Sequence, residues 1–414
     1  MVRVIGAGLS GLAAAWCVTE AGQDVEVVEA ASGPGGLIET VHTPEGLVER
    51  AANGFVWSET TARWFRELEI TPCRANDASR RRFIFRDGRP RRWPLSPSET
   101  AGLVLRAGWA WARRDLRPRD TETIAAWSTR IGGEATSRWL ATPALQGIYA
   151  APADRLSARA VFAGRSRGAP GTGARGKSRS RGIVAPPGGM GEFVERLFEG
   201  LRARGVGFAF DCRSDTLDAS VATIVATSAP SAARLIAPHA PRLAEAIGRV
   251  PMTSIVSVTA FFATSTSDLR GFGVLFPRET GVRALGVLFN TDIFDGRGTG
   301  RSETWVYGSL AGALPLPTTA EVPEWIAEDR RRLTGRTDRP MAIGPARAGS
   351  PPLLPVYDGT ILTIQERMAD LPPWLALAGN YLGRLGVAKL LDVAREAADR
   401  VTGSAAVGAS RARG

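Results

Sequence analysis

The residues that could do chemistry near the amino terminus are glycines at fixed spacing. They form the run Gly6-Ala7-Gly8-Leu9-Ser10-Gly11, which fits the pattern Gly-x-Gly-x-x-Gly. In such a run the first glycine allows a tight turn, the second lets the backbone approach a pyrophosphate, and the third lets a helix pack closely on a strand. The free N–H groups at the start of the following helix then face the phosphates. The spacing therefore predicts a dinucleotide site.

Two strands and a helix must hold these glycines in place. The apolar segment 2–5 predicts a strand, and residues 12–21 predict a helix rich in Leu and Ala. Residues 25–28 predict a second strand, which ends at Glu29. Glu29 stands eighteen residues after Gly11, where an acid can bind the hydroxyls of an adenosine ribose. Glycine spacing alone would be a weak signal, but the complete strand, helix and strand make it strong.

A second run, Gly171-Thr172-Gly173-Ala174-Arg175-Gly176, has the same spacing without this context. No apolar strand precedes it, and it lies within a Gly-, Arg- and Ser-rich stretch at 164–182. We interpret it as a surface loop.

The segment that follows Glu29 distinguishes between cofactors. It contains the doublet Gly35-Gly36, which resembles the glycine pair that FAD-dependent amine oxidases and their relatives place beneath the cofactor. Side chains at these positions would collide with the pyrophosphate and ribityl chain. The resemblance implies FAD rather than NAD. It adds four candidate cofactor-binding residues: Gly35, Gly36, Leu37 and Thr40.

A strand, a Gly-rich loop and a helix recur near the carboxyl terminus. Residues 375–378 predict a buried strand, 379–387 a loop, and 388–401 an amphipathic helix. A helix that begins near Gly386 could favour the negative charge that a flavin acquires on reduction. The candidate residues of this loop are Asn380, Leu385, Gly386 and Val387.

Composition excludes several classes of function. The chain has 414 residues, is 44% hydrophobic, and can form two or three packed layers. Its net charge of +11 comes from scattered Arg without a nucleic-acid reader motif, so we expect no nucleic-acid partner. Two His and three Cys without ligand spacing predict no metal site. With neither a signal peptide nor an apolar run of spanning length, we expect a cytoplasmic protein.

Further segments follow the order typical of one family. They are Gly35–Ile38, Arg82–Gly88 with Trp93–Leu95, Gly147–Ala150 with Leu156–Ser157, Pro187–Met190, Gly271–Pro277, Leu353–Tyr357 and Gly379–Val387. Together they resemble the FAD-dependent protoporphyrinogen and coproporphyrinogen oxidases of haem synthesis, within the amine oxidase superfamily. The resemblance covers nearly the whole chain.

That resemblance implies an α/β fold in which an FAD-binding Rossmann-type domain is interleaved with a substrate-binding β-sheet and a helical domain. The FAD domain is expected from residues 1–75, 183–250 and 355–405. A helical insert at 76–182 would serve substrate and membrane-surface contacts, and 251–354 would supply the substrate sheet. Residues 406–414 would form a tail.

The implied reaction is oxidation of a porphyrinogen, an anionic tetrapyrrole, to the porphyrin. It removes six electrons in three flavin cycles, with O2 as the acceptor. The protein would orient the macrocycle and exclude water, so no catalytic side chain is expected. Arg82 would bind a propionate and Leu275 would line the cavity. The resemblance leaves open which porphyrinogen is used and the oligomeric state, and it makes peripheral membrane contact an expectation.

Departures from the family keep other functions open. Glu39 stands where many members carry Arg, and the segments after Ser157 and at 211–224 are short. One alternative is an amine oxidase or desaturase, although amine oxidases generally place a Lys near the flavin and Lys177 and Lys389 fit that place poorly. Another is a redox-inactive porphyrin-binding flavoprotein.

Overall fold

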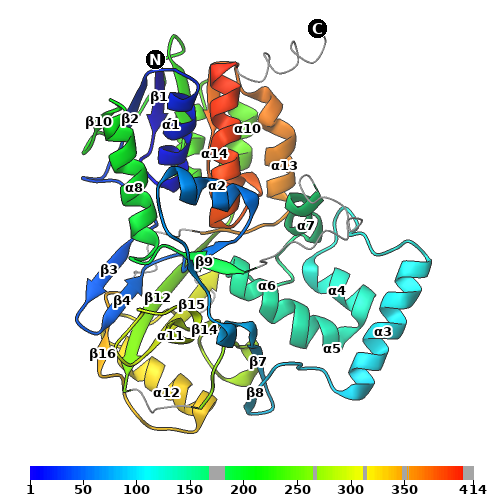
Figure 1. Ribbon diagram of the computed structural model, residues 1–414. Helices are drawn as coiled ribbons and strands as arrows, with labels where there is room; N and C mark the ends of the chain where they lie inside the picture. The colour runs from blue at the N-terminus through cyan, green and yellow to red at the C-terminus, as the bar shows by residue number, and fades with distance from the viewer. Residues whose placement is uncertain (167–181, 264–267, 311–314, 347–351, 353, 404–414) are drawn as a thin grey trace.

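The computed structural model describes residues 1–166, 182–263, 268–310, 315–346, 352 and 354–403. Figure 1 shows a sheet-and-helix layer in the upper half, a second sheet below it, and helices to the right. The Gly171–Gly176 run lies outside the described residues.

A five-stranded parallel sheet forms the upper part of the molecule. Its strands in spatial order are β10 (Gly207–Ala209), β2 (Val25–Val28), β1 (Val2–Ile5), β11 (Ala222–Val225) and β18 (Leu375–Leu377). All four pairings are parallel. Their residues are mostly apolar, as is typical of a parallel sheet that is covered on both faces.

Helices cover the two faces of this sheet. One core contains buried residues of α1 (Leu9–Glu20), α8 (Met190–Ala203) and α14 (Val387–Thr402). The other contains buried residues of α9 (Ala229–Ile236), α10 (Pro241–Gly248) and α13 (Thr360–Arg367). A parallel sheet between two helical layers confirms the predicted α/β fold.

The second sheet has the strand order β16-β12-β15-β14-β13-β7-β8. Its long central pair is β12 (Met252–Phe262) with β15 (Arg301–Leu310). The other strands are β7 (Arg82–Arg86), β8 (Arg89–Arg91), β13 (Gly273–Leu275), β14 (Gly286–Phe289), β16 (Ala342–Ile343) and β17 (Leu354–Pro355), which also pairs with β12. Helix α12 (Val322–Thr334) packs on one face.

Strands β7 and β8 lie in a segment expected to be largely helical, yet they belong to this sheet. Strand β7 pairs in parallel with β13, nearly two hundred residues further along the chain. The helices that follow are α3 (Pro97–Ala112), α4 (Ile124–Gly132), α5 (Glu134–Thr136), the π-helical turn η2 (Ser137–Ala141), α6 (Thr142–Tyr149) and α7 (Ala158–Ser166).

Two small sheets and further short helices complete the described chain. The small sheets are β3 (Thr40–Thr43) with β4 (Gly46–Glu49), and β5 (Phe55–Val56), β9 (Ile183–Ala185) and β6 (Cys73–Arg74). The helices are α2 (Glu59–Glu67) and α11 (Asn290–Ile293), with 3-10 turns η1 (Asp77–Arg80), η3 (Arg278–Thr280), η4 (Met368–Asp370) and η5 (Asn380–Leu382). Buried Ile293 and Phe294 pack with β9 and with Leu288 of β14.

Candidate active site

The turn between β1 and α1 is built so tightly that it requires glycine. A Cβ added to Gly11 would lie 1.8 Å from the carbonyl oxygen of Gly6. At Gly8, by contrast, an added Cβ would meet nothing nearer than the Cα of Gly36, at 3.8 Å. Gly8 is the N-cap residue of helix α1, which has no side-chain cap and no acidic residue in its first turn. Its N–H groups are therefore available to an anion that approaches over Gly8.

Glu29 is held against this turn at the carboxyl end of β2. Its Oε2 accepts a hydrogen bond from the Ala7 N–H at 2.6 Å, and its Oε1 accepts one from the Ala31 N–H at 2.8 Å. These bonds fix the carboxylate beside the glycines. Each oxygen keeps a second lone pair that a ribose hydroxyl could use.

A segment that is not among the predicted cofactor-binding residues runs alongside Glu29. The Glu29 N–H donates to the Ala209 carbonyl at 2.9 Å, the Asp211 N–H donates to the Ala31 carbonyl, and the Cys212 N–H donates to the Glu29 carbonyl. Residues 209–212 thus extend the edge of the sheet next to the expected adenosine end. The signal that could have found them is the short β-prone run Gly207–Phe210 after a helix.

The Gly35-Gly36 doublet lies directly on the glycine turn. The Gly35 N–H donates to the Ala7 carbonyl at 2.9 Å, and Gly8 and Gly35 form an isolated parallel bridge. Gly36 has φ +62°, and a Cβ added there would lie 3.0 Å from the Cα of Gly8. Two chain segments can approach this closely only because both carry glycine.

Thr40 links this region to the start of α8. Its hydroxyl donates to Glu49 at 2.7 Å and accepts from the Gly191 N–H at 2.7 Å. The other Glu49 oxygen accepts from the Met190 N–H and from Arg297. Glu49 is 4% exposed, so its charge is stabilised by a helix start and a buried guanidinium. Thr40 therefore contributes to the framework of the turn.

The carboxyl-terminal loop leads into a second uncapped helix. Gly386 has φ +107° and precedes α14, whose first turn has neither a side-chain cap nor an acidic residue. Helices α1 and α14 pack side by side (Figure 1) and begin at the same edge of the parallel sheet. Leu385 and Val387 contact the cores on the two sides.

Tyr357 secures the same loop. Its hydroxyl donates to the Asn380 carbonyl at 2.5 Å, and its ring lies 5.0 Å from that of Tyr149 on α6. Burial raises the pKa of the Tyr357 hydroxyl, so it stays protonated and acts as a donor. The loop, α6 and the end of β17 are thereby held together.

The eight-stranded sheet has a face that is only partly covered, which we call the open face. Strand register places five half-buried residues on it: Ile255, Ser257, Leu275, Leu288 and Val306. Leu275 lies against α6, since a Cβ on Gly147 would meet the leucine Cδ2 at 2.5 Å. The open face is therefore a largely apolar wall that ends at α6.

Arg82 stands on the rim of this wall. Arg82 pairs with Gly273 in the β7–β13 register, and Leu275 lies two residues after Gly273 on β13. Residues two apart on a strand point to the same face, so the two predicted substrate residues share one face of the sheet. The Arg82 guanidinium lies 4.5 Å from the Phe272 ring centroid, and it forms no ion pair within the described residues. Its charge is available to an anion.

The other groups singled out in the sequence lie elsewhere. Glu39 forms an ion pair with Arg50 at 2.7 Å. Lys389 lies on α14, half exposed, 3.4 Å from Asp392. Lys177 falls outside the described residues.

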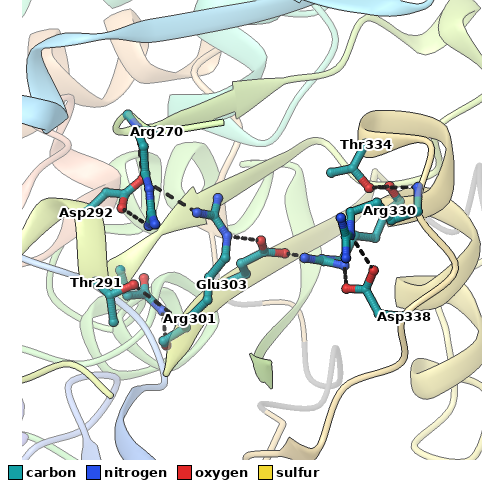
Figure 2. Close-up of polar contacts among 12 residues, drawn as sticks. Arg270, Thr291, Asp292, Arg301, Glu303, Arg330, Thr334 and Asp338 are labelled. Carbon is teal, nitrogen blue, oxygen red and sulfur yellow. Dashed lines mark hydrogen bonds and ion pairs between the residues drawn. The ribbon is translucent and has the colours of Figure 1, made fainter. Parts of the chain in front are cut away.

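The opposite face of the sheet, which we call the sealed face, contains a buried ionic network that the sequence reasoning missed. Figure 2 shows Glu303 between Arg301 and Arg330, at 2.5 and 3.1 Å. Arg301 and Glu303 are at most 2% exposed, and Arg330 is fully buried. Asp338 pairs with Arg330, and Asp292 pairs with Arg270. Every charge in this network has a partner, which indicates a structural role.

The fold and the glycine turn define the class of the protein as an FAD-binding oxidoreductase. Residues 9–340 match the model of the flavin containing amine oxidoreductases, and the chain belongs to that family.

Several individual proteins are similar along nearly their whole length. Protoporphyrinogen oxidase 2 of Arabidopsis thaliana is 25% identical over 97% of this chain and 93% of its own. Coproporphyrinogen III oxidase of Propionibacterium freudenreichii is 25% identical over 97% and 90%. Among solved structures, cyclohexylamine oxidase from Brevibacterium oxydans superposes with a TM-score of 0.70 at 18% identity, over 97% of this chain and 98% of its own. The structural likeness shows the shared fold.

Proposed function

We propose that the enzyme oxidises a porphyrinogen, protoporphyrinogen IX or coproporphyrinogen III, to the porphyrin in haem synthesis. The observation that carries the proposal is the open face, an apolar wall with an unpaired arginine at its rim. A largely apolar macrocycle with acidic side chains complements such a surface. The sequence similarity to oxidases of both substrates supports the same assignment.

The residues of this chain have binding and positioning roles in the proposed reaction. FAD, when bound, would supply the oxidising chemistry: six hydrogen atoms would leave the substrate over three cycles, with three O2 reduced to H2O2. Gly6–Gly11, Glu29 and the Gly35-Gly36 doublet would hold its adenosine and pyrophosphate, and the start of α14 would face its ring system. Arg82 would pair with a propionate, and Leu275 would press the macrocycle against the cofactor.

The proposal is tested by anaerobic mixing of the FAD-loaded protein with each porphyrinogen in turn while flavin absorbance is recorded. We expect rapid reduction by at least one of them, followed by reoxidation when O2 is admitted. A protein that binds porphyrin but is never reduced would instead be a redox-inactive porphyrin-binding flavoprotein.

An amine oxidase is the second candidate, because the fold is shared with cyclohexylamine oxidase. Amine oxidation in that superfamily generally relies on a lysine near the flavin, and Lys389 is the one lysine in the described residues. It pairs with Asp392 on the outside of α14. We therefore expect Lys389→Met to leave the rate of flavin reduction within about twofold of wild type. A loss of two or more orders of magnitude would favour amine oxidase chemistry.

We also propose that the enzyme is cytoplasmic and that helix α3 brings it to an anionic membrane surface. No helix in the described part of the chain is long and apolar enough to cross a bilayer. Exposed apolar side chains nevertheless gather on α3, with Leu105 at 74%, Trp109 at 63% and Trp111 at 72%. Arg106 and Arg113 lie among them without an ion pair in the described residues, and Arg113 stacks on Trp109. Tryptophan and arginine together suit an interface with anionic lipid.

Co-sedimentation with vesicles tests this contact. Phosphatidylglycerol vesicles should retain the protein at low salt and phosphatidylcholine vesicles should not, and Trp109→Ser with Trp111→Ser should release it. Equal recovery of this double variant and the wild type would refute the contact.

A further inference from the structure

Leu275 of the open face sits against two glycines that come from different parts of the chain. A Cβ on Gly147 of α6 would lie 2.5 Å from the Leu275 Cδ2, and a Cβ on Gly286 of β14 would lie 3.2 Å from the same atom. The leucine methyl therefore occupies space that both residues leave free by lacking a side chain. Real Cβ atoms do not approach a methyl group to 2.5 Å, so any larger residue at 147 displaces Leu275.

The backbone at residue 147 gives no other reason for glycine. Gly147 lies inside α6, and its φ is not in the positive range that favours glycine. Glycine destabilises a helix interior relative to alanine. The room that it leaves for Leu275 accounts for this unfavourable choice.

A third glycine, Gly308, makes a similar contact between α6 and the sheet, one helical turn further along α6. A Cβ on Gly308 of β15 would lie 2.5 Å from the Leu285 Cδ1 and 3.8 Å from the Cβ of Ala150, the C-cap residue of α6. Helix α6 thus lies close to the sheet along its last turn. It can do so because the closest positions on both elements carry the smallest side chains.

We propose that Gly147 is a positioning residue that sets where Leu275 stands on the open face, and thereby which macrocycle this face accepts. The inference rests on the proposed function for the identity of the substrate. The nearest atom to a new side chain at 147 is the end of a flexible side chain rather than backbone. A methyl group there should therefore turn Leu275 away from α6, across the half-buried open face, while the fold is kept.

The experiment compares Gly147→Ala, Leu275→Ala and the double variant, all loaded with FAD. Gly108→Ala is the matched control, because Gly108 lies inside α3 and an added Cβ there meets nothing within 4 Å. For each protein we would measure KM and kcat with both porphyrinogens, the rate of flavin reduction by dithionite, and the affinity for the product porphyrins from quenching of flavin fluorescence.

We expect Gly147→Ala to raise KM about tenfold for at least one porphyrinogen, since misplacing one methyl group in a binding wall has effects of this order. FAD content, Tm and reduction by dithionite should match Gly108→Ala. The double variant should behave like Leu275→Ala, because truncating the leucine removes the clash. The inference would be overturned, with the proposed function intact, by either of two results. One is a Gly147→Ala variant with wild-type KM for every substrate, and the other is a double variant in which the effects of the two substitutions on KM simply add.

Measurements of porphyrin binding distinguish a failure of the proposed function from a failure of the inference on Gly147. A wild type that turns over neither porphyrinogen would refute the proposed function. The inference would still hold if porphyrin affinity fell in Gly147→Ala and returned to the Leu275→Ala value in the double variant. A wild type that neither oxidises porphyrinogens nor binds porphyrins would overturn both.

Discussion

The two faces of the eight-stranded sheet hold their charges in opposite ways. On the sealed face, Arg301 and Arg330 are buried, share Glu303, and stack on Phe289 and Phe262. On the open face, Arg82 is exposed, its guanidinium lies over the ring of Phe272, and it makes no ion pair within the described residues. Arginine therefore belongs to the buried core on the sealed face, whereas on the open face it presents to solvent a charge that is unpaired in the part of the chain that the structure describes.

Burial explains why the two faces differ. A charge removed from water needs a partner of opposite charge, and on the sealed face a carboxylate lies between each pair of guanidinium groups. A substrate-binding arginine must instead keep an unpaired group in the free protein, which is possible only where water solvates it. Substitutions on the sealed face should therefore change stability, and substitutions on the open face should change binding.

The largest effect is expected when the sealed network loses its central carboxylate. Glu303→Ala leaves Arg301 and Arg330 buried without their shared partner, which should lower the free energy of unfolding by about 3–5 kcal/mol. Denaturant unfolding of the FAD-loaded protein measures this. Glu324→Ala is the control, because its ion pair with Arg339 is exposed at 68% and 73%, and its loss should cost at most about 1 kcal/mol. Equal losses in the two variants would show that the network contributes nothing beyond a surface pair.

An intermediate effect, on binding alone, is expected at the open face. Arg82→Ala removes a guanidinium that can pair bidentately with a propionate, and should weaken apparent affinity by about 1.5–3 kcal/mol, or roughly ten- to a hundredfold in KM. The maximal rate and Tm should change little, because the contact is remote from the reacting carbon and Arg82 makes no ion pair among the described residues.

Arg81→Ala serves as the control for Arg82. Arg81 precedes β7, is exposed, and makes no ion pair in the described residues. Wild-type KM in both variants would mean that Arg82 is a surface residue and that the open face holds its substrate otherwise.

The sequence predicts a feature well when its residues are close together in the chain and poorly when they are far apart. Gly6–Gly11, Glu29 and Gly35-Gly36 lie within thirty-one residues of one another, and cofactor recognition there depends on backbone geometry that glycine spacing reports directly. The fold class and FAD followed from these residues. The contact of Leu275 with Gly147 joins residues that are far apart in sequence, and no local pattern encodes it. One sequence pattern did indicate the ionic network on the sealed face. The charged residues 301 and 303 alternate along β15 and lie on the same side of the strand as Trp305 and Tyr307.

The smallest effect, on the free energy of unfolding, is expected from the ion pair between Arg86 and Glu99. It joins the helical insert to one end of the open face. Arg86 shares that face with Arg82, but it is paired bidentately with Glu99 of α3 and also lies over the Trp139 ring. The guanidinium, together with the Ser96 N–H, lowers the pKa of Glu99 from 4.5 to about 2. This carboxyl binds its proton more weakly in the folded chain than in the unfolded one. The stability that it contributes is therefore complete above pH 4.5 and is lost as the pH falls toward 2.

Glu99→Gln tests this contribution, because glutamine keeps the helix cap at Ser96 and removes only the charge. Since the Glu99 side chain is 24% exposed, solvent screening should limit the loss near pH 7 to about 1–2 kcal/mol. Urea unfolding at steps from pH 7 to pH 3 should show the gap between wild type and variant narrowing below pH 4.5. In an Arg86→Met background the substitution should cost much less at every pH, because the guanidinium that lowers the pKa is gone. A gap that stays constant from pH 7 to pH 3 would mean that the Arg86–Glu99 charge pair does not hold the insert against the sheet.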